Sequence, residues 1–314
     1  MYKLNPEKQI SVNKEVIKKI LGRYSIYNFT FNPVNQGITN TSFVIESLNK
    51  KYLLRIYAQG KNTEEILFEI SFQDHLRENN IPIPLIYKNV SGEKLSLVEI
   101  DEKEWQCILM EFVEGKSVTE NPNQELISEL AQIQAKIHIL GIEFGNTKDK
   151  PNKILVDLHD SSTEKLIEIP VKKQEVFDFV ERAKNYKYHL NENLPYGYNH
   201  LDIDFDGNVL VKDNKITAIL DFDDLKYSPA VVCLGYSLWN ILDDEGLDSM
   251  KYYLNEYQKV RSLNNLELES LRHIILFRNY QIGLIRLILW EENTPIKNIE
   301  NLIVLEKEIP FLVL

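Results

Sequence analysis

The 314-residue chain has little cysteine and no long hydrophobic run. Cys107 and Cys233 are its only cysteines, so a disulfide framework is not predicted and a reducing compartment fits better. No apolar stretch approaches the roughly 20 residues that a membrane-spanning helix needs. Residues 1–10 also lack the apolar core of a signal peptide. We therefore expect a cytoplasmic protein with no membrane association.

A positively charged balance is also missing. Lys and Arg number 36 against 47 Asp and Glu, which gives a formal net charge of -11. Binding to a nucleic acid backbone needs clustered basic residues, so no nucleic acid partner is expected. An acidic chain suits a cationic small molecule better. The length allows one large domain or two lobes, and 44% hydrophobic residues are ordinary for a globular protein.

The acidic segment at residues 198–223 carries the strongest chemical signal. It reads YNHLDIDFDGNVLV at 198–211, and ILDFD follows at 219–223. An acid two residues after a His, then an Asn and a second acid after a short strand, supply what phosphoryl transfer asks of a protein. Asp202 would orient the attacking hydroxyl and take its proton, and Asn208 and Asp221 offer oxygen ligands for Mg²⁺. These residues predict the active centre of a kinase.

The same acids also imitate a calcium-binding EF-hand loop. The spacing within residues 202–207 follows that pattern, but Asp213 stands at the twelfth position in place of the usual bidentate Glu. An EF-hand needs a helix on each side. Here a turn is predicted at 193–197 and a β-branched strand at 215–220. This context favours the kinase interpretation.

Hydrophobic periodicity divides the chain near residue 113. In the first part it predicts a helix over 12–21, a second over 63–78, and strands at 29–31, 42–46, 51–57, 95–100 and 105–112. In the second part it predicts helices over 125–140, 174–188, 231–242, 248–261 and 266–290. We therefore predict an α+β fold with two lobes. A small antiparallel-sheet lobe would span residues 1–113, and a mainly helical lobe with the catalytic loop would span 114–314.

These features resemble the aminoglycoside phosphotransferase, choline kinase and homoserine kinase-like family, which has a protein kinase-like fold. The family pattern is His-x-Asp, four residues, Asn, and then a strand that ends in Ile-Asp. The matching residues here, with one extra loop residue, are His200, Asp202, Asn208 and Asp221. The resemblance implies ATP and Mg²⁺ as cofactors, Asp202 as the catalytic base, and Asn208 and Asp221 as metal ligands. It implies a structural role for His200.

The resemblance also assigns residues to the nucleotide. The turn at 36–43 is similar to the family's Gly-x-x-Asn-x-x-Phe turn over the phosphates, although it lacks a full Gly-rich loop. Arg55 takes the place of the strand cation that contacts ATP phosphates, and Glu69 that of the helix acid that pairs with it. Residues 111–115 resemble the hinge that presents backbone groups to adenine. The implied nucleotide contacts are Gly37, Asn40, Thr41, Arg55, Glu69, Glu111 and Val113.

The acceptor site is implied to lie in the helical lobe, and the acceptor itself stays open. Acids and aromatic rings there suit an amine such as an aminoglycoside. In contrast, Arg278 and Arg286 on one predicted helix favour a carboxylate-bearing amino alcohol. Cys233 stands where the family commonly has an Asp that braces the catalytic loop, so a different support is expected. The implied acceptor contacts are Asp223, Asp243, Asp244, Arg278, Trp290 and Glu291.

The sequence therefore predicts an ATP- and Mg²⁺-dependent phosphotransferase that moves the γ-phosphate to a hydroxyl of a small molecule. It is most similar to aminoglycoside phosphotransferases. An amino-alcohol kinase of the homoserine or choline type is one alternative, and a nucleotide-binding module without catalysis is another. The joint presence of Asp202, Asn208 and Asp221 favours catalysis, because binding alone needs no base. The oligomeric state and the choice between ATP and GTP are not predicted.

Overall fold

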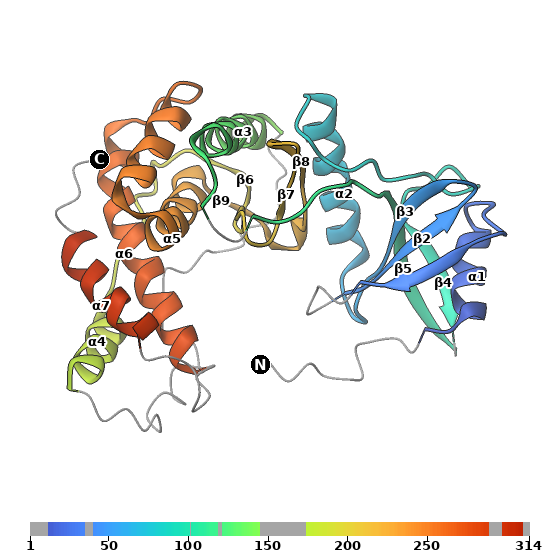
Figure 1. Cartoon of the computed structure of the whole chain (residues 1–314), viewed down its shortest axis with the longest axis horizontal. Coiled ribbons are helices and arrows are strands. Elements are labelled where there is room, and N and C mark those ends of the chain that lie inside the picture. Colours follow the sequence, from blue (N-terminus) through green and yellow to red (C-terminus); the bar gives the residue numbers. More distant parts are fainter. Residues whose placement is uncertain are drawn as a thin grey trace. The chain divides into compact units, whose positions relative to one another are not determined.

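The computed structural model describes residues 12–34, 40–100, 102–118, 121–144, 174–288 and 297–309. The chain divides into two units, whose elements are labelled in Figure 1. The first comprises Met1–Lys116, Leu210–Lys212 and Thr217–Asp223, and the second Ser117–Val209, Asp213–Ile216 and Asp224–Leu314. Two late acids, Asp221 and Asp223, thus group with the first unit. The lobe boundary after Val113 stays a prediction.

A five-stranded antiparallel sheet forms the centre of the first unit, in the order β1-β2-β3-β5-β4. Its strands are β1 (Thr30–Pro33), β2 (Thr41–Ser47), β3 (Lys50–Ile56), β4 (Ser96–Ile100) and β5 (Lys103–Glu111). The strands predicted at 42–46 and 51–57 are confirmed as the hairpin of β2 and β3, whose turn residues Leu48 and Asn49 have φ of 48° and 62°. The register pairs Arg55 with Ser42 and with Ile108, so Arg55 stands on a central strand.

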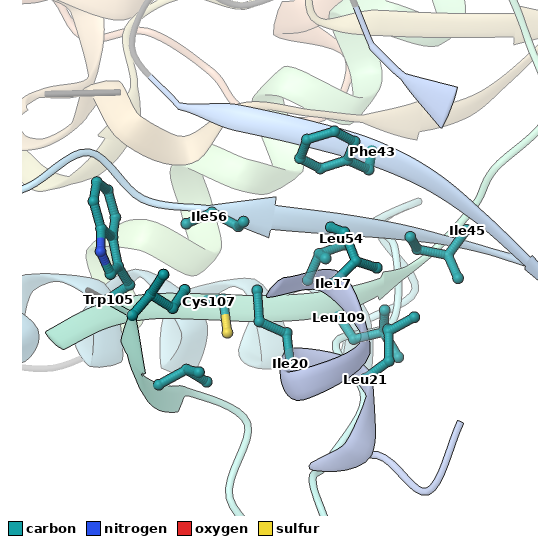
Figure 2. Close-up of a cluster of buried hydrophobic side chains, with 12 residues drawn as sticks. Ile17, Ile20, Leu21, Phe43, Ile45, Leu54, Ile56, Trp105, Cys107 and Leu109 are labelled. Atoms are coloured by element: carbon teal, nitrogen blue, oxygen red, sulfur yellow. The ribbon is translucent and has the colours of Figure 1, made fainter. Parts of the chain in front are cut away.

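One face of the sheet packs on α1 (Lys14–Gly22). This helix begins after Asn13, whose side-chain oxygen accepts a hydrogen bond from the Val16 N–H at 3.0 Å and caps it. Each fully buried aliphatic side chain there contributes about 1.5–3 kcal/mol before entropy costs. Figure 2 shows the core, which joins Ile17, Ile20 and Leu21 to Phe43, Ile45, Leu54, Ile56, Trp105, Cys107 and Leu109.

The other face packs on α2 (Thr63–Glu78), whose bounds agree with the prediction. Asn62 caps this helix by accepting a hydrogen bond from the Glu64 N–H at 2.7 Å. Side chains alternate along a strand, so Arg55 shares this face with Leu53, which packs in the α2-side cluster. Glu69 of α2 is buried, with 7% of its surface exposed. The alternation of β3 and the start of α2 together bring both charged residues to the same side of the sheet.

Helices dominate the second unit. They are α3 (Gln124–Glu143), α4 (Gln174–Asn185), α5 (Ala230–Gln258), α6 (Asn265–Ile288) and α7 (Lys297–Glu308). The two helices predicted over 231–242 and 248–261 form the single kinked α5, in which Gly246 takes a φ of 84°. Helix α7 was not predicted. Among the described residues, no helix has both the length and the hydrophobicity to cross a membrane.

Two unpredicted strands, β6 (Tyr196–His200) and β9 (Leu225–Pro229), pair antiparallel in the second unit. The turn predicted at 193–197 is therefore wrong at its C-terminal end, where β6 begins. Helix α3 lies directly on β6, because a Cβ on Gly141 would stand only 2.0 Å from the Tyr198 oxygen. Glycine permits this approach, and no other residue has room there. Since β6 ends at His200, this packing sets where the catalytic loop begins.

The hairpin of β7 (Val209–Lys212) and β8 (Lys215–Ile219) follows the loop. Its turn residues Asp213 and Asn214 have φ of 50° and 59°, which suits a tight hairpin turn. A short 3₁₀ helix at Phe222–Asp224 comes after β8. The strand predicted at 215–220 is confirmed as β8, and Asp221 follows shortly after its end.

Candidate active site

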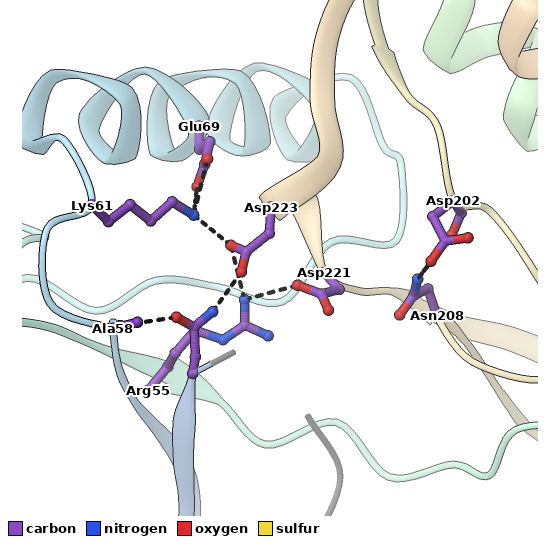
Figure 3. A network of polar contacts seen from close by, with 9 residues as sticks. Arg55, Ala58, Lys61, Glu69, Asp202, Asn208, Asp221 and Asp223 are labelled. Atoms are coloured by element: carbon purple, nitrogen blue, oxygen red, sulfur yellow. Dashed lines mark hydrogen bonds and ion pairs between the residues drawn. The ribbon is translucent and has the colours of Figure 1, made fainter. Parts of the chain in front are cut away.

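The loop between β6 and β7 brings Asp202 and Asn208 together. The Asn208 Nδ2 donates to both the main-chain oxygen and Oδ2 of Asp202, at 2.9 Å each (Figure 3). A turn takes up the extra loop residue, because the N–H groups of Gly207 and Asn208 donate to the Asp204 oxygen at 3.4 and 3.1 Å. The extra loop residue therefore does not prevent the contact between Asp202, the predicted base, and Asn208, the predicted metal ligand.

The other loop acids serve the turn. Asp204 Oδ1 accepts a hydrogen bond from the Asp206 N–H at 3.2 Å, which forms an Asx turn. The loop runs from β6 to β7, so the flanking helices that an EF-hand requires are absent. In the described part of the chain, no group of three or more His, Cys, Asp or Glu could hold a metal ion. The EF-hand alternative is therefore wrong.

Buried polar groups hold the backbone on both sides of Asp202. Cys233 Sγ donates to the His200 oxygen at 2.8 Å, and Ser237 Oγ donates to the Ile203 oxygen at 3.3 Å. Burial raises the pKa of the Cys233 thiol to about 12, so the thiol keeps its proton and its donor role. Cys233 itself thus supplies a hydrogen bond to the loop where the family commonly has Asp.

A glutamine connects these two donors. Gln134 Nε2 lies 3.3 Å from Cys233 Sγ and donates to Ser237 Oγ at 2.7 Å. Its Oε1 accepts from the Tyr253 hydroxyl at 2.8 Å. His200 is fully buried and its Nδ1 accepts from the Asp202 N–H at 3.2 Å, as a structural role requires. The sequence did not predict this network, because Gln134 and Ser237 lie about 100 residues apart and carry no motif.

Five charged side chains meet in the first unit and are called the charged cluster below (Figure 3). Arg55 Nη1 lies 3.2 Å from Asp221 Oδ1 and 3.7 Å from Asp223 Oδ1. Lys61 Nζ lies 2.7 Å from Asp223 Oδ1 and 3.2 Å from Glu69 Oε1. Glu69 forms its ion pair with Lys61, whereas the predicted partner Arg55 forms its ion pairs with Asp221 and Asp223. The prediction overlooked Lys61, although it stands in the turn just before α2.

The electrostatics of the charged cluster reflect burial against opposite charge. Burial acts to raise the pKa of Asp223, but Arg55 and Lys61 outweigh it and lower that pKa. Burial raises the pKa of Glu69 to about 7, although Lys61 acts to lower it. Burial acts to lower the pKa of Arg55, but Asp221 and other neighbours raise it. Arg55 Nε is buried and has no hydrogen-bond partner, which suits a site that a ligand completes.

Asp221 and Asn40 complete this arrangement. Asp221 has a φ of 61°, a left-handed conformation that Asp tolerates, and 43% of its side chain is exposed. Asn40 Nδ2 donates to Asp223 Oδ2 at 2.5 Å, while its Oδ1 accepts from the Ala58 N–H at 3.2 Å. Asp223, predicted to contact the acceptor, thus joins the predicted nucleotide contacts Asn40 and Arg55.

The other predicted nucleotide contacts are dispersed. Thr41 opens β2 and pairs with Ile56. Glu111 ends β5, and its carboxylate accepts from the Leu85 N–H at 3.1 Å and lies 3.6 Å from Arg77. Val113 is half-buried. Gly37 lies outside the described residues.

Two arginines of α6 that were proposed for the acceptor already contact neighbours. Arg286 Nη2 donates to Asp243 Oδ2 at 2.6 Å, and its guanidinium lies 5.7 Å from the Trp239 ring centroid. The Arg278 guanidinium lies 4.5 Å from the Tyr236 ring centroid. Such contacts over aromatic faces are ordinary for arginine. They weaken the argument that these arginines bind a carboxylate of the acceptor.

Acids in the second unit influence one another electrostatically. Burial, reinforced by Asp204, Asp243 and Glu245, raises the pKa of Asp244 to about 6. Burial also raises the pKa of Asp204 itself. The predicted acceptor residues Asp243 and Asp244 thus share a negative region with an acid of the catalytic loop. Trp290 and Glu291 lie outside the described residues.

The donor chemistry fits Mg²⁺ and a polyphosphate. Mg²⁺ prefers carboxylate and amide oxygens, and Asp221 of the first unit and Asn208 of the second each carry one such group. Asn208 Nδ2 is committed to Asp202, so Oδ1 is the atom that would meet a metal ion. The unpaired Arg55 Nε and the Lys61 ammonium are the cationic donors of the charged cluster that a phosphate oxygen could meet.

Residues 30–266 match the Phosphotransferase enzyme family. The chain belongs to this family. Its membership confirms the predicted family resemblance and the prediction of a small-molecule kinase. The match begins at β1 and ends at the start of α6, so it covers both the charged cluster and the catalytic loop of this phosphotransferase.

Curated relatives of the phosphotransferase are named homoserine kinase. The protein of Methylobacillus flagellatus is 24% identical over 74% of this chain and 72% of its own length. That of Zymomonas mobilis is 24% identical over 91% of this chain and 89% of its own length.

Solved structures show the same fold at low identity. An amicoumacin kinase in complex with AMP-PNP and Ca²⁺ has a TM-score of 0.70 at 18% identity and covers 98% of this chain and 96% of its own. An aminopropanol kinase has a TM-score of 0.64 at 18% identity, over 95% of both chains. A spectinomycin phosphotransferase with ADP and spectinomycin has a TM-score of 0.63 at 17% identity, over 97% and 100%. The predicted protein kinase-like fold is confirmed.

Proposed function

We propose that this phosphotransferase uses ATP and Mg²⁺ to phosphorylate a hydroxyl group of a small, amine-bearing molecule. The observation that carries the proposal is the contact of Asn208 with Asp202, at 2.9 Å to both the backbone and the carboxylate. It fixes a carboxylate at the start of a loop whose backbone is braced from both sides. A non-catalytic module would need neither the base nor its support.

Each residue has a distinct task in this proposal. Asp202 accepts a hydrogen bond from the acceptor hydroxyl, orients it and takes its proton. Asn208 Oδ1 and the Asp221 carboxylate would hold Mg²⁺, which when bound neutralises phosphate charge. The partial exposure of Asp221 supports its access to a metal ion.

The acids of the second unit support an amine on the acceptor. Burial, reinforced by Asp204 and other nearby acids, raises the pKa of Asp244, and burial also raises the pKa of Asp204, so the acids give the region around the loop a negative potential. A protonated amine would lower that repulsion. Homoserine and aminopropanol, named in the relatives, each carry both an amine and a hydroxyl group. Small amino alcohols are therefore the first acceptors, and amine-bearing antibiotics such as spectinomycin are the second.

ADP release from Mg²⁺-ATP tests the function. A coupled assay would compare homoserine, aminopropanol and choline with spectinomycin and aminoglycosides. One acceptor class should stimulate ADP release well above the rate without an acceptor. Chelation of Mg²⁺ by EDTA should abolish this stimulation. No stimulation by any amine-bearing acceptor would contradict the proposed acceptor class.

Two acids of the same loop provide a matched comparison. Asp202→Asn should lower turnover by about three orders of magnitude or more, while ATP affinity changes little, because the base acts in the chemical step. Asp206→Asn, at an exposed position, should leave turnover within about twofold. Equal losses in both variants would remove Asp202 from its special role.

A further inference from the structure

Two cations of the charged cluster share Asp223 and differ in their second partner (Figure 3). Arg55 lies closest to Asp221, at 3.2 Å, and is 3.7 Å from Asp223. Lys61 lies 2.7 Å from Asp223 and 3.2 Å from Glu69. Arg55 is therefore tied to the acid proposed to bind Mg²⁺, whereas Lys61 is tied to the acid of α2.

The main chain of its loop fixes the position of Lys61. The Gln106 side-chain Nε2 donates to the main-chain oxygen of Lys61 at 3.3 Å, and the main-chain oxygen of Gln106 accepts from the Tyr57 N–H at 2.9 Å. Gly60 has a φ of 83°, which L side chains rarely adopt, and Asn62 then caps α2. β5 and α2 thus hold both ends of the loop. The main chain of Lys61 is therefore fixed in place, and its side chain extends from a defined position.

A single side chain links this loop to the turn expected to cover the phosphates. Asn40 lies at the end of that turn. Its side chain donates a hydrogen bond to Asp223 at 2.5 Å and accepts one from the Ala58 N–H at 3.2 Å. The Lys61 ammonium has three N–H donors, and Glu69 and Asp223 accept from two of them. The third donor suits a phosphate oxygen, and the four-carbon stem lets the charge follow it.

Charge balance points to the same class of ligand. Arg55 and Lys61 face the carboxyl groups of Asp221, Asp223 and Glu69. A divalent cation at Asp221 would add two positive charges to this cluster. The charged cluster would then attract a polyanion such as a nucleotide triphosphate.

We propose that Lys61 contacts the phosphates of ATP, that Glu69 positions Lys61, and that Arg55 instead holds Asp221. This inference rests on the proposed use of ATP. It gives the phosphate contact that the resemblance assigned to Arg55 to a residue six positions later in the chain.

Binding of ATP and of adenosine to the full chain, by isothermal titration in Mg²⁺, tests this assignment. Lys61→Met keeps an unbranched stem beside Tyr57, whose ring centroid lies 4.9 Å from the ammonium, and removes the charge. The Kd for ATP should rise at least about tenfold, while that for adenosine changes less than about twofold, because only ATP offers phosphates. Lys61→Arg should keep the Kd for ATP within about threefold of the natural chain.

A second lysine of the same unit gives a matched control. Lys94 pairs with Asp74 of α2, and its side chain is 19% exposed, the same as that of Lys61. Lys94→Met should leave both Kd values unchanged. Circular dichroism would check folding, and Lys61→Gln replaces Lys61→Met if the latter fails to fold. An ATP Kd within twofold of the natural value in a folded, uncharged Lys61 variant would overturn the assignment.

The role of Glu69 needs a double-variant comparison. Glu69→Gln should weaken ATP binding several-fold when Lys61 is present and have no further effect when Lys61 is Met. Additive losses would overturn the positioning role. These binding tests do not depend on turnover. If Lys61→Met binds ATP more weakly but adenosine normally, and the natural chain phosphorylates no acceptor, the proposed function alone is wrong. If the natural chain phosphorylates an acceptor but Lys61→Met binds ATP normally, this inference alone is wrong.

Discussion

The catalytic loop and the charged cluster position their acids by different means. Around Asp202 the backbone is held by uncharged groups, such as Cys233 and Ser237, that are buried and donate to main-chain oxygens. Around Asp223 the partners are the cations Arg55 and Lys61, with side chains 17% and 19% exposed. Buried, uncharged hydrogen bonds therefore set the geometry of the loop, whereas a balance of charges sets the geometry of the charged cluster.

This difference affects how each region can respond to a ligand. Removing one partner of a buried neutral hydrogen bond costs about 1–3 kcal/mol, because the other partner stays unsatisfied. Each cation of the charged cluster contacts two acids, so a new charge can replace one partner while the other is kept. We expect the loop to stay rigid and the charged cluster to rearrange when metal and nucleotide bind. Four variants test this contrast.

Asp221→Asn should have the largest effect on activity. Asn tolerates the left-handed backbone at this position, where φ is 61°, but it cannot supply the charge that Mg²⁺ needs. Steady-state kinetics should show kcat/KM lower by about 10³-fold or more, or about 4 kcal/mol. Urea unfolding should change by less than about 1 kcal/mol, since the pair with Arg55 is partly exposed. Asp213→Asn, another left-handed Asp, is the control, and equal kinetics for both variants would contradict the metal role.

Gly141→Ala should have the largest effect on stability. The added Cβ would stand 2.0 Å from the Tyr198 oxygen, so α3 and β6 would have to separate. We expect a loss of about 3 kcal/mol or more in the free energy of unfolding, measured in urea. Gly22→Ala, where nothing lies within 4 Å, should change stability by less than about 1 kcal/mol. A mild Gly141→Ala variant would mean that packing does not fix the start of the loop.

The contrast also explains what could be predicted from the sequence. Asp202 and Asn208 are six residues apart, so a local motif predicts their contact even with an inserted residue. The partner of Glu69 depends on the path of the loop between β3 and α2, which no local pattern specifies, and Lys61 was overlooked. Strand β6 was missed because YGYNH has a glycine and no β-branched residue, and pairing with β9 overrides its weak propensity. Long-range contacts decided both misses.

Glu69→Gln should change how stability depends on pH. Burial raises the pKa of Glu69 to about 7, so between the ordinary glutamate pKa and pH 7 the folded chain binds more protons than the unfolded chain. This group therefore stabilises the folded chain less as the pH rises. From pH 5 to pH 8, unfolding free energies without ligand should shift in favour of Glu69→Gln by on the order of 2 kcal/mol. Glu65→Gln, at an exposed position of α2, controls for general charge effects. A pH-independent difference would show that the Glu69 pKa is ordinary.

Cys233→Val should have the smallest effect, and it tests the loop side of the comparison. Valine keeps the apolar volume but leaves the His200 oxygen without the thiol donor 2.8 Å away. We expect a loss of about 1–2 kcal/mol in stability and a fall of up to about tenfold in kcat, with little change in the KM for ATP. Cys233→Ser restores a donor and should recover most of the kcat. If both variants lose stability but keep the natural kcat, the loop geometry is set by the contact of Asn208 with Asp202 alone. If only Cys233→Val loses kcat, the buried network holds Asp202 in its reactive position, and neutral packing is as much a part of the active site as the charges are.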